Sequence, residues 1–478
     1  MRRLVWLTAA ITGLASCGDN NSGNPDAKPA DPDAPRIDAP LVDAPPGFTL
    51  PTPFAVPLSA AGPDQLQSAT AAPDGKFYAA GYAGAALTGP RYVTVVRLTT
   101  TGVDTAFGTG GAVTTTLDFR GGSDEVDIAT QPSGKIIVSA TVANATNSAD
   151  RDVAVLRLLP TGALDTTFGD NGIRILDLST GHNNGTALVG LDAARAIAID
   201  GDGRIYVHAA SRGEGTATGG GPRIDTDFTV ARLTAEGALD TAWATNGKIQ
   251  VDIQESNATP RAIRAFADGT VIASGYANST GVGTVQPVLY KLTATGARDA
   301  AWAGGLFHEA VLAIQTEVYS FAVHGTKLVT GGYGRNSGTT NDYISLRFDL
   351  ATGARDLTWG GTTTGASLVD PSGTMAGSNC RTVLGLPDGR TALIGSTGPT
   401  NLPAQDGVIV ILGEDGKVDT QTYGDGIHTF ALGGNGNDQL WGGAVSGGAA
   451  VFVGYKGGGA TPTATNNDDA YAIVMPLR

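Results

Sequence analysis

Residues 155–172 read VLRLLPTGALDTTFGDNG, and this stretch decides the fold because weaker copies of it return along the chain. In each copy an apolar strand-like run precedes a turn glycine, an aspartate and an aromatic residue. The turn glycines are 57 to 75 residues apart and stand at Gly102, Gly162, Gly237, Gly296, Gly353 and Gly416. Alternating apolar residues indicate a β-strand, and a glycine after them indicates a tight turn.

A second landmark, a turn followed by an apolar strand, precedes each copy. It occurs seven times, as PDGKFYAAGY (73–82), PSGKIIVSAT (132–141), GDGRIYVHAA (201–210), ADGTVIASGY (267–276), HGTKLVTGGY (324–333), PDGRTALIGS (387–396) and SGGAAVFVGY (446–455). Each unit has room for four strands, which in the second unit we place at 111–119, 125–132, 135–142 and 152–160. Four short antiparallel strands per unit are typical of a β-propeller blade. The sequence therefore predicts an all-β fold, a single seven-bladed β-propeller of four-stranded antiparallel blades.

The two ends of the body are complementary. Residues 52–60, TPFAVPLSA, resemble the strand that follows the Asp–aromatic turn in complete units, and the last unit stops at VMPLR without that strand. We therefore predict that the N-terminal strand of the body closes the propeller within the last blade. Such a closure removes exposed sheet edges.

The repeated residues have structural interpretations. Glycine permits the positive φ of a tight turn, the aspartate accepts hydrogen bonds from turn amides, and the aromatic wedges between neighbouring blades. A basic residue recurs seven to nine positions before the aspartate in five units, where we expect an ion pair: Arg97, Arg157, Arg232, Lys291 and Arg347.

The combined pattern, RL-x-x-x-G-x-LD-x-x-FG-x-x-G together with PDGK and an apolar strand, resembles the delta-60 repeat of bacterial surface and secreted proteins. The resemblance spans essentially all of residues 54–478 and is strongest in the first three units. In later units Trp or Tyr replaces Phe, and Arg298 or Arg355 replaces the Leu before the aspartate. The resemblance implies a propeller-like array and no assigned activity.

The N-terminus has the features of a lipoprotein export signal. Arg2 and Arg3 precede an apolar run at 4–15 that is too short to span a bilayer core of ~30 Å. The run ends in Leu14-Ala15-Ser16-Cys17, which resembles a bacterial lipobox, and the resemblance implies lipidation of Cys17. An ordinary signal peptide with an incidental cysteine is the alternative.

Three regions follow from this interpretation. Residues 1–16 are the predicted signal peptide, and residues 17–53 are a lipidated cysteine with a disordered Pro/Asp/Ala tether. Residues 54–478 form the propeller. We expect a monomer that is anchored in the bacterial cell envelope, at the periplasmic or outer face of the outer membrane.

Composition excludes some partners. The net charge of −14 argues against nucleic acid, which requires a basic face. Two cysteines provide no disulfide framework, and lipidation of Cys17 leaves Cys380 as a small residue packed in the interior.

Several motifs resemble metal sites, but each has a simpler interpretation. GGNGNDQLW, at 433–441, matches one calcium-binding nonapeptide, which makes Asp438 a weak calcium candidate; such sites need adjacent copies. Asp200-Gly201-Asp202-Gly203 occupies an ordinary turn, and Asp225 and Asp227 are expected to be solvated loop charges. The five histidines lack metal-ligand spacing. We therefore expect no catalytic residue, no metal and no cofactor.

The function that the sequence favours is non-catalytic, a binding or scaffold module for a protein or polysaccharide. The alternative is a propeller hydrolase or lyase with an acidic site at one face of the central channel. Non-repeated Asp, Glu, His or Arg residues clustered at the channel mouth would favour the enzyme. The longer third unit, with segments 179–192 and 211–226, is the expected place for a binding loop.

Overall fold

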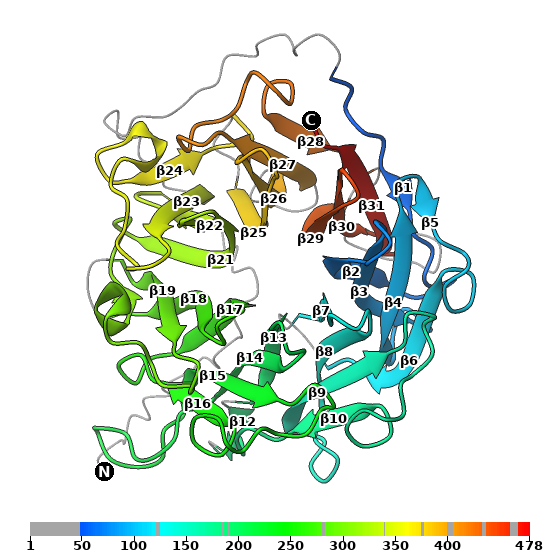
Figure 1. The fold of residues 1–478 in the computed structure, drawn as a ribbon. Helices are drawn as coiled ribbons and strands as arrows, with labels where there is room; N and C mark the ends of the chain where they lie inside the picture. The colour runs from blue at the N-terminus through cyan, green and yellow to red at the C-terminus, as the bar shows by residue number, and fades with distance from the viewer. Residues whose placement is uncertain are drawn as a thin grey trace, which may run out of the picture.

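The computed structural model describes residues 48–478 except 121–124, 184, 190, 280–282, 339, 374–376, 399–404, 433–435 and 459–466. The described chain is almost entirely β-structure, and its sheets stand side by side around a centre, as in a β-propeller (Figure 1). No helix in the described part is long and apolar enough to cross a membrane.

Most strands belong to sets of four that pair antiparallel in chain order, and we call each set a blade. The innermost strands are β2 (Asp64–Ala71), β7 (Asp127–Thr130), β13 (Ala193–Ile199), β17 (Ala258–Ala265), β21 (Gln315–His324), β25 (Gly377–Gly385) and β29 (Gln439–Ser446). The second strands are β3 (Phe77–Gly84), β8 (Ile136–Ala143), β14 (Ile205–Arg212), β18 (Val271–Asn278), β22 (Lys327–Arg335), β26 (Thr391–Gly398) and β30 (Ala449–Lys456).

The third strands are β4 (Arg91–Thr99), β9 (Arg151–Leu158), β15 (Thr226–Leu233), β19 (Val285–Leu292), β23 (Asp342–Asp349), β27 (Asp406–Leu412) and β31 (Asp469–Pro476). The outermost are β6 (Ala112–Asp118), β10 (Ile173–Leu176), β16 (Lys248–Val251), β20 (Phe307–His308), β24 (Ala366–Val369), β28 (Ile427–Phe430) and β1 (Phe54–Ala55). Shorter elements are β5 (Gly102–Val103), β11 (His182–Asn183), β12 (Leu188–Val189) and the 3₁₀ turns η1 (Trp302–Gly305) and η2 (Trp359–Gly361).

The sequence-based unit boundary is wrong by one strand. We placed 111–119 as the first strand of the second unit, but β6 pairs antiparallel with β4 and therefore belongs to the preceding blade. The Asp–aromatic turn reverses the chain directly, so the strand after it returns along the strand before it. β10 pairs with β9 in the same way.

The first and last strands share one sheet. β1 pairs antiparallel with β31, with Phe54 opposite Ala472 and Ala55 opposite Tyr471. The carboxylate of Asp64 reinforces this junction, because it accepts hydrogen bonds from the amides of Ser59 (2.7 Å) and Ala470 (2.6 Å). Chain segments more than 400 residues apart therefore meet at one buried side chain.

The repeat turns bind blade to blade on one face of the molecule, which we call the turn face. The amide of the residue after the aromatic donates to a carbonyl in the next blade's turn in five places: Gly108 to Thr161, Gly169 to Glu236, Ala244 to Thr295, Ala303 to Thr352 and Gly360 to Asp415. These bonds are 2.8–3.1 Å long. The repeated turns therefore link the blades.

The predicted ion pairs form in four of the five units. Nε of Arg157 lies 2.8 Å from Asp165 Oδ2, and both side chains are buried. The corresponding pairs are Arg97–Asp104, Arg232–Asp240 and Arg347–Asp356. Lys291 and Asp299 are linked through their backbones, with the Asp299 amide donating to the Lys291 carbonyl.

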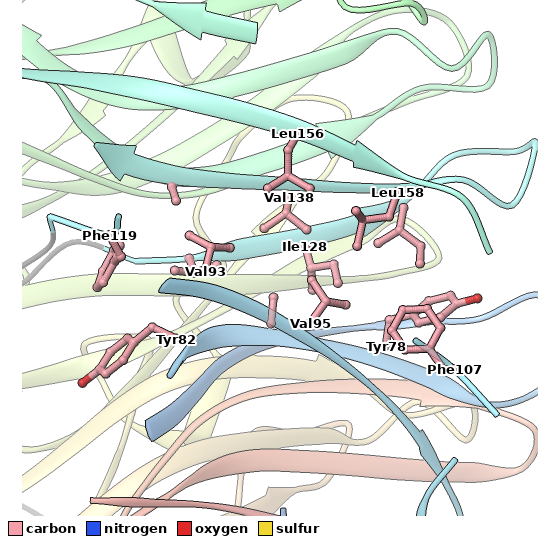
Figure 2. Packing of buried hydrophobic residues seen from close by; sticks show 14 of the residues in the cluster. Tyr78, Tyr82, Val93, Val95, Phe107, Phe119, Ile128, Val138, Leu156 and Leu158 are labelled. Atoms are coloured by element: carbon pink, nitrogen blue, oxygen red, sulfur yellow. The ribbon is translucent and has the colours of Figure 1, made fainter. Parts of the chain in front are cut away.

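The hydrophobic core lies in layers between neighbouring blades. Figure 2 shows one layer, in which Val95 of β4 and Tyr78 of β3 face Ile128 of β7 and Leu156 of β9. The predicted aromatic wedge belongs to this packing, since Phe107 is fully buried and its ring lies beside Tyr78. Cys380 is also buried, as expected.

Gly237 gives a direct test of the wedge. A Cβ there would lie 2.7 Å from the Phe168 ring of the preceding blade, and its φ is +86°. We expect Gly237→Val to lower the free energy of unfolding by about 1–3 kcal/mol more than Gly215→Val. Gly215 has nearly the same φ, +85°, but open space around its Cβ. Urea unfolding measures both; equal losses would mean that the blade contact contributes nothing.

Candidate functional site

The innermost strands surround a central cavity of about 210 Å³. All seven innermost strands, or the residues just before them, contribute lining side chains. The lining is polar and charged, which distinguishes it from the apolar layers between blades. It includes guanidinium groups from three separate blades, contributed by Arg195, Arg261 and Arg381.

A β-bulge delivers one side chain from each of six blades into this cavity. In six innermost strands the pairing with the second strand skips one residue, and each skipped residue lines the cavity: Gln67, Arg195, Arg261, Tyr319, Arg381 and Trp441. A bulge bends the strand and re-aims a side chain. The remaining blade contributes Glu125 and Asp127 at the start of β7.

Arg261 is the most constrained of these residues. Its Nη1 lies 2.5 Å from a carboxylate oxygen of Glu125, and its Nη2 donates to the hydroxyls of Tyr276 (3.0 Å) and Tyr319 (2.8 Å). Its guanidinium also stacks on the Tyr319 ring, 3.9 Å from the centroid. Its Nε is buried and has no hydrogen-bond partner among the described residues. Arg261 is therefore held rigidly beside Tyr319.

Arg381 lies between two aromatic rings. Its guanidinium carbon is 5.1 Å from the centroid of Tyr319 and 4.6 Å from that of Trp441. Trp441 is fixed in turn, because its Nε1 donates to Gln439 Oε1 at 2.9 Å. Such stacking orients a planar guanidinium.

Two acidic side chains near the cavity are buried. Burial raises the pKa of Asp127 to about 6, although Ser68 and the Ile197 amide donate hydrogen bonds to it. Burial also raises the pKa of Glu317, which lies two residues before Tyr319 on β21. The carboxylate of Asp127 is thus partly protonated near pH 6.

The cavity combines arginine, carboxylate and aromatic side chains. Three guanidiniums converge on one small cavity in a chain whose net charge is −14. Guanidinium groups bind carboxylates and phosphates through paired N–H donors. The three arginines, with Glu125 and Asp127, form a non-repeated cluster of the residue types that the sequence analysis treated as a sign of an enzyme.

The two residues singled out from the sequence are not among the cavity residues that the structure describes. Cys17 is outside the described residues. Asp438 accepts hydrogen bonds from the amides of Leu432 (2.8 Å) and Gly457 (3.0 Å), and burial raises its pKa. It immediately precedes β29, as Asp192 precedes β13. Since 433–435 are not described, the calcium role of Asp438 stays an untested prediction.

The expectation of solvated charges at Asp225 and Asp227 is wrong. Asp227 is 1% exposed, and Arg223 forms ion pairs with both aspartates and with Asp252. The insertion in the third unit folds back on its own blade because this arginine lies among three carboxylates. The Asp200 turn is as predicted, with its carboxylate bonded to the amides of Asp202 and Arg204.

The sequence reasoning missed the cavity residues, although a signal for them exists. In four blades, the cavity residue at the bulge stands eight positions before the glycine of the second landmark, as Arg195 stands before Gly203. The other pairs are Gln67–Gly75, Arg261–Gly269 and Arg381–Gly389. Aligning the units on that glycine reveals a position that varies between blades while its surroundings repeat.

The described chain has the fold of a β-propeller whose central cavity is lined by residues that differ from blade to blade. A comparison with protein-family models agrees with this fold. A family model described as a domain of unknown function (DUF5122) beta-propeller matches residues 131–168. No curated protein shows significant sequence similarity to the chain.

Solved structures match the chain at low identity and with TM-scores below 0.5. A protein of unknown function from Dyadobacter fermentans DSM 18053 is 12% identical, covers 91% of this chain and 100% of its own, and has a TM-score of 0.46. The polysaccharide lyase Uly1 is 11% identical over 93% of this chain and 95% of its own, also with a TM-score of 0.46. The microbial sialidase Hz136 is 12% identical over 74% and 65%, with a TM-score of 0.39.

Proposed function

We propose that the chain is a binding protein whose central cavity holds an anionic group of an envelope polysaccharide. The observation that carries this proposal is the convergence of Arg195, Arg261 and Arg381 from three blades on one cavity. A repeated structural role does not explain them, because the same bulge position holds other residue types in the remaining blades. Convergence of non-repeated side chains is a property of sites.

The proposed scaffold is a single ring of seven four-stranded blades that β1 closes within the last blade. The pairing of β1 with β31 and the blade-to-blade turn bonds support this arrangement. The proposed location is the bacterial cell envelope, with Cys17 as the lipid anchor and residues 17–53 as the tether. The lipobox-like Leu14–Cys17 stretch supports this location.

Capture from envelope extract tests the binding function. The protein used is the chain from residue 17 carrying Cys17→Ser, which we expect to retain acidic polysaccharide. Arg381→Gln should reduce the retained amount at least 10-fold, which is about the effect of losing one charge-assisted hydrogen bond. Carbohydrate analysis of the eluate measures retention. Deleting 215–221, which leaves Arg223 in place, is the matched control and should retain binding. Loss of binding in this deletion alone would move the site to the third-blade loop.

An enzyme is the second candidate function, because the cavity holds the non-repeated acidic residues Asp127 and Glu125 beside its arginines. A hydrolase or lyase that uses Asp127 as its acid would shorten the captured polysaccharide during incubation. Size-exclusion chromatography of the polysaccharide distinguishes the two functions. An unchanged profile supports binding without catalysis.

A further inference from the structure

We propose that residues 48–59 form a strap across the last blade, and that release of this strap opens the ring at the junction of the last blade with the first. We number the blades one to seven in the order of their innermost strands. This inference rests on the proposed ring of seven blades and adds what holds its junction and where it opens. Contacts of the strap with blades six, seven and one carry it.

Blade seven lacks the turn-to-turn bonds that join the other blades. The five bonds of this kind connect blades one to six in series, from Gly108–Thr161 to Gly360–Asp415. In the described part of the chain none of them reaches blade seven, because β31 ends at Pro476 and no Asp–aromatic turn follows it in the sequence. Both interfaces of blade seven therefore depend on other contacts.

Phe48 makes the contact with blade six. Its ring stacks on the His428 imidazole, with the ring centroids 5.2 Å apart, and meets the Tyr423 ring edge-on at 6.0 Å. Tyr423, the aromatic of blade six's own repeat turn, is fully buried. The Arg478 amide donates to the Tyr423 hydroxyl at 3.1 Å, and the Arg478 guanidinium lies over the Phe48 ring. The two ends of the body therefore take the place on this aromatic that the next blade's turn glycine takes in the other interfaces.

The strap then crosses blade seven and ends on blade one. β1 lies beside β31 and pairs with it (Figure 1), and the buried Val56 donates its amide to the Ala470 carbonyl at 2.8 Å. Beyond β1, the Ser59 hydroxyl donates to the Gly84 carbonyl at the end of β3, also at 2.8 Å. One short segment therefore contacts three blades.

The strap spans the junction that only non-covalent contacts close. The chain runs from β1 directly into blade one, and it reaches β31 from blade six through β29 and β30. The pairing of β1 with β31 is two residues long, so the contacts of Phe48 and Val56 beside it matter for its persistence. We therefore expect blade seven to open at a lower free energy than the other blades. Because blade seven carries Trp441, its opening loosens one wall of the central cavity.

Hydrogen–deuterium exchange measured by mass spectrometry tests the strap in the chain from residue 17 that carries Cys17→Ser. In Phe48→Ala we expect the amides of 54–56 and 469–476 to exchange at least 10-fold faster, about the effect of losing packed aromatic contacts. The second blade, followed at 136–143 and 151–158, should exchange at an unchanged rate. The matched control is Leu50→Ala, which truncates a nearby side chain that is 43% exposed and should change neither region.

A chain that begins at residue 52 provides a second variant, because it lacks Phe48 and keeps β1. It should show the same local increase in exchange. An equal increase in every blade would mean that Phe48 contributes to overall stability alone and would overturn the strap. Unchanged exchange at 54–56 and 469–476 in both variants would overturn it as well. The proposed ring would then be judged separately, by the stability of a chain that begins at residue 58.

Discussion

A chain that begins at residue 58 is expected to lose roughly 3–5 kcal/mol of unfolding free energy relative to one that begins at residue 52. The shorter chain lacks β1 and Val56, whose side chain is 1% exposed and whose amide donates to the Ala470 carbonyl. Burial of a valine contributes ~1.5–3 kcal/mol, and each backbone hydrogen bond contributes ~1 kcal/mol. Urea unfolding monitored by tryptophan fluorescence measures the difference.

The comparison isolates the closing strand because both chains lack the segment before residue 52. Loss of β1 also leaves β31 as an exposed edge, so the shorter chain should self-associate at high concentration. Analytical ultracentrifugation detects this association. Equal stability of the two chains would show that the proposed closure does not hold the ring together.

The second large effect is expected at the buried Arg157–Asp165 pair. Arg157→Leu should lower the free energy of unfolding by about 2–3 kcal/mol, because the buried Asp165 loses its hydrogen bond from Arg157 and keeps the ion pair with Lys135 at 2.8 Å. Arg157 also donates to the Ala235 carbonyl of the next blade and stacks on Phe168. The matched control is Arg97→Leu, whose pair with Asp104 is more exposed and should contribute about 1 kcal/mol or less.

The same pair predicts a pH dependence. Burial raises the pKa of Asp165, but hydrogen bonds from Lys135 and Thr167 and the charge of Arg157 outweigh it and hold the pKa below its ordinary value. A lowered pKa stabilises the folded state above the unfolded pKa of about 4, and this stabilisation is lost as the pH falls. The difference between wild type and Arg157→Leu should therefore be largest at neutral pH and should shrink below pH 4. A difference that grew in acid would contradict this assignment.

The architecture was predictable from the sequence because six of the seven units repeat the Asp–aromatic turn. Each of five turns donates a backbone hydrogen bond to the turn of the next blade, and turn glycines such as Gly237 pack against the aromatic of the preceding blade. The unit boundary was less predictable, since a run such as 111–119 has the same alternation whether it pairs backward or forward. Only the pairing of β6 with β4 decides this.

The site was not predictable in the same way. Arg195 and Arg381 are 186 positions apart, and both line the cavity because each stands at a β-bulge. The sequence of a single unit does not mark these bulges, and only the alignment of several units shows the position. The insertion at 211–226 attracted attention by its length, yet Arg223 binds it to its own blade. In a repeat fold, the informative residue is the one that differs at a position where its neighbours agree.

A crystal structure of the chain with the acidic polysaccharide captured from envelope extract tests the central claim most directly. The proposed function predicts an anionic group of the polysaccharide in the central cavity, inside a ring of seven blades closed by β1. A sugar bound at the 213–225 loop or on the turn face, with the cavity unoccupied, would contradict it.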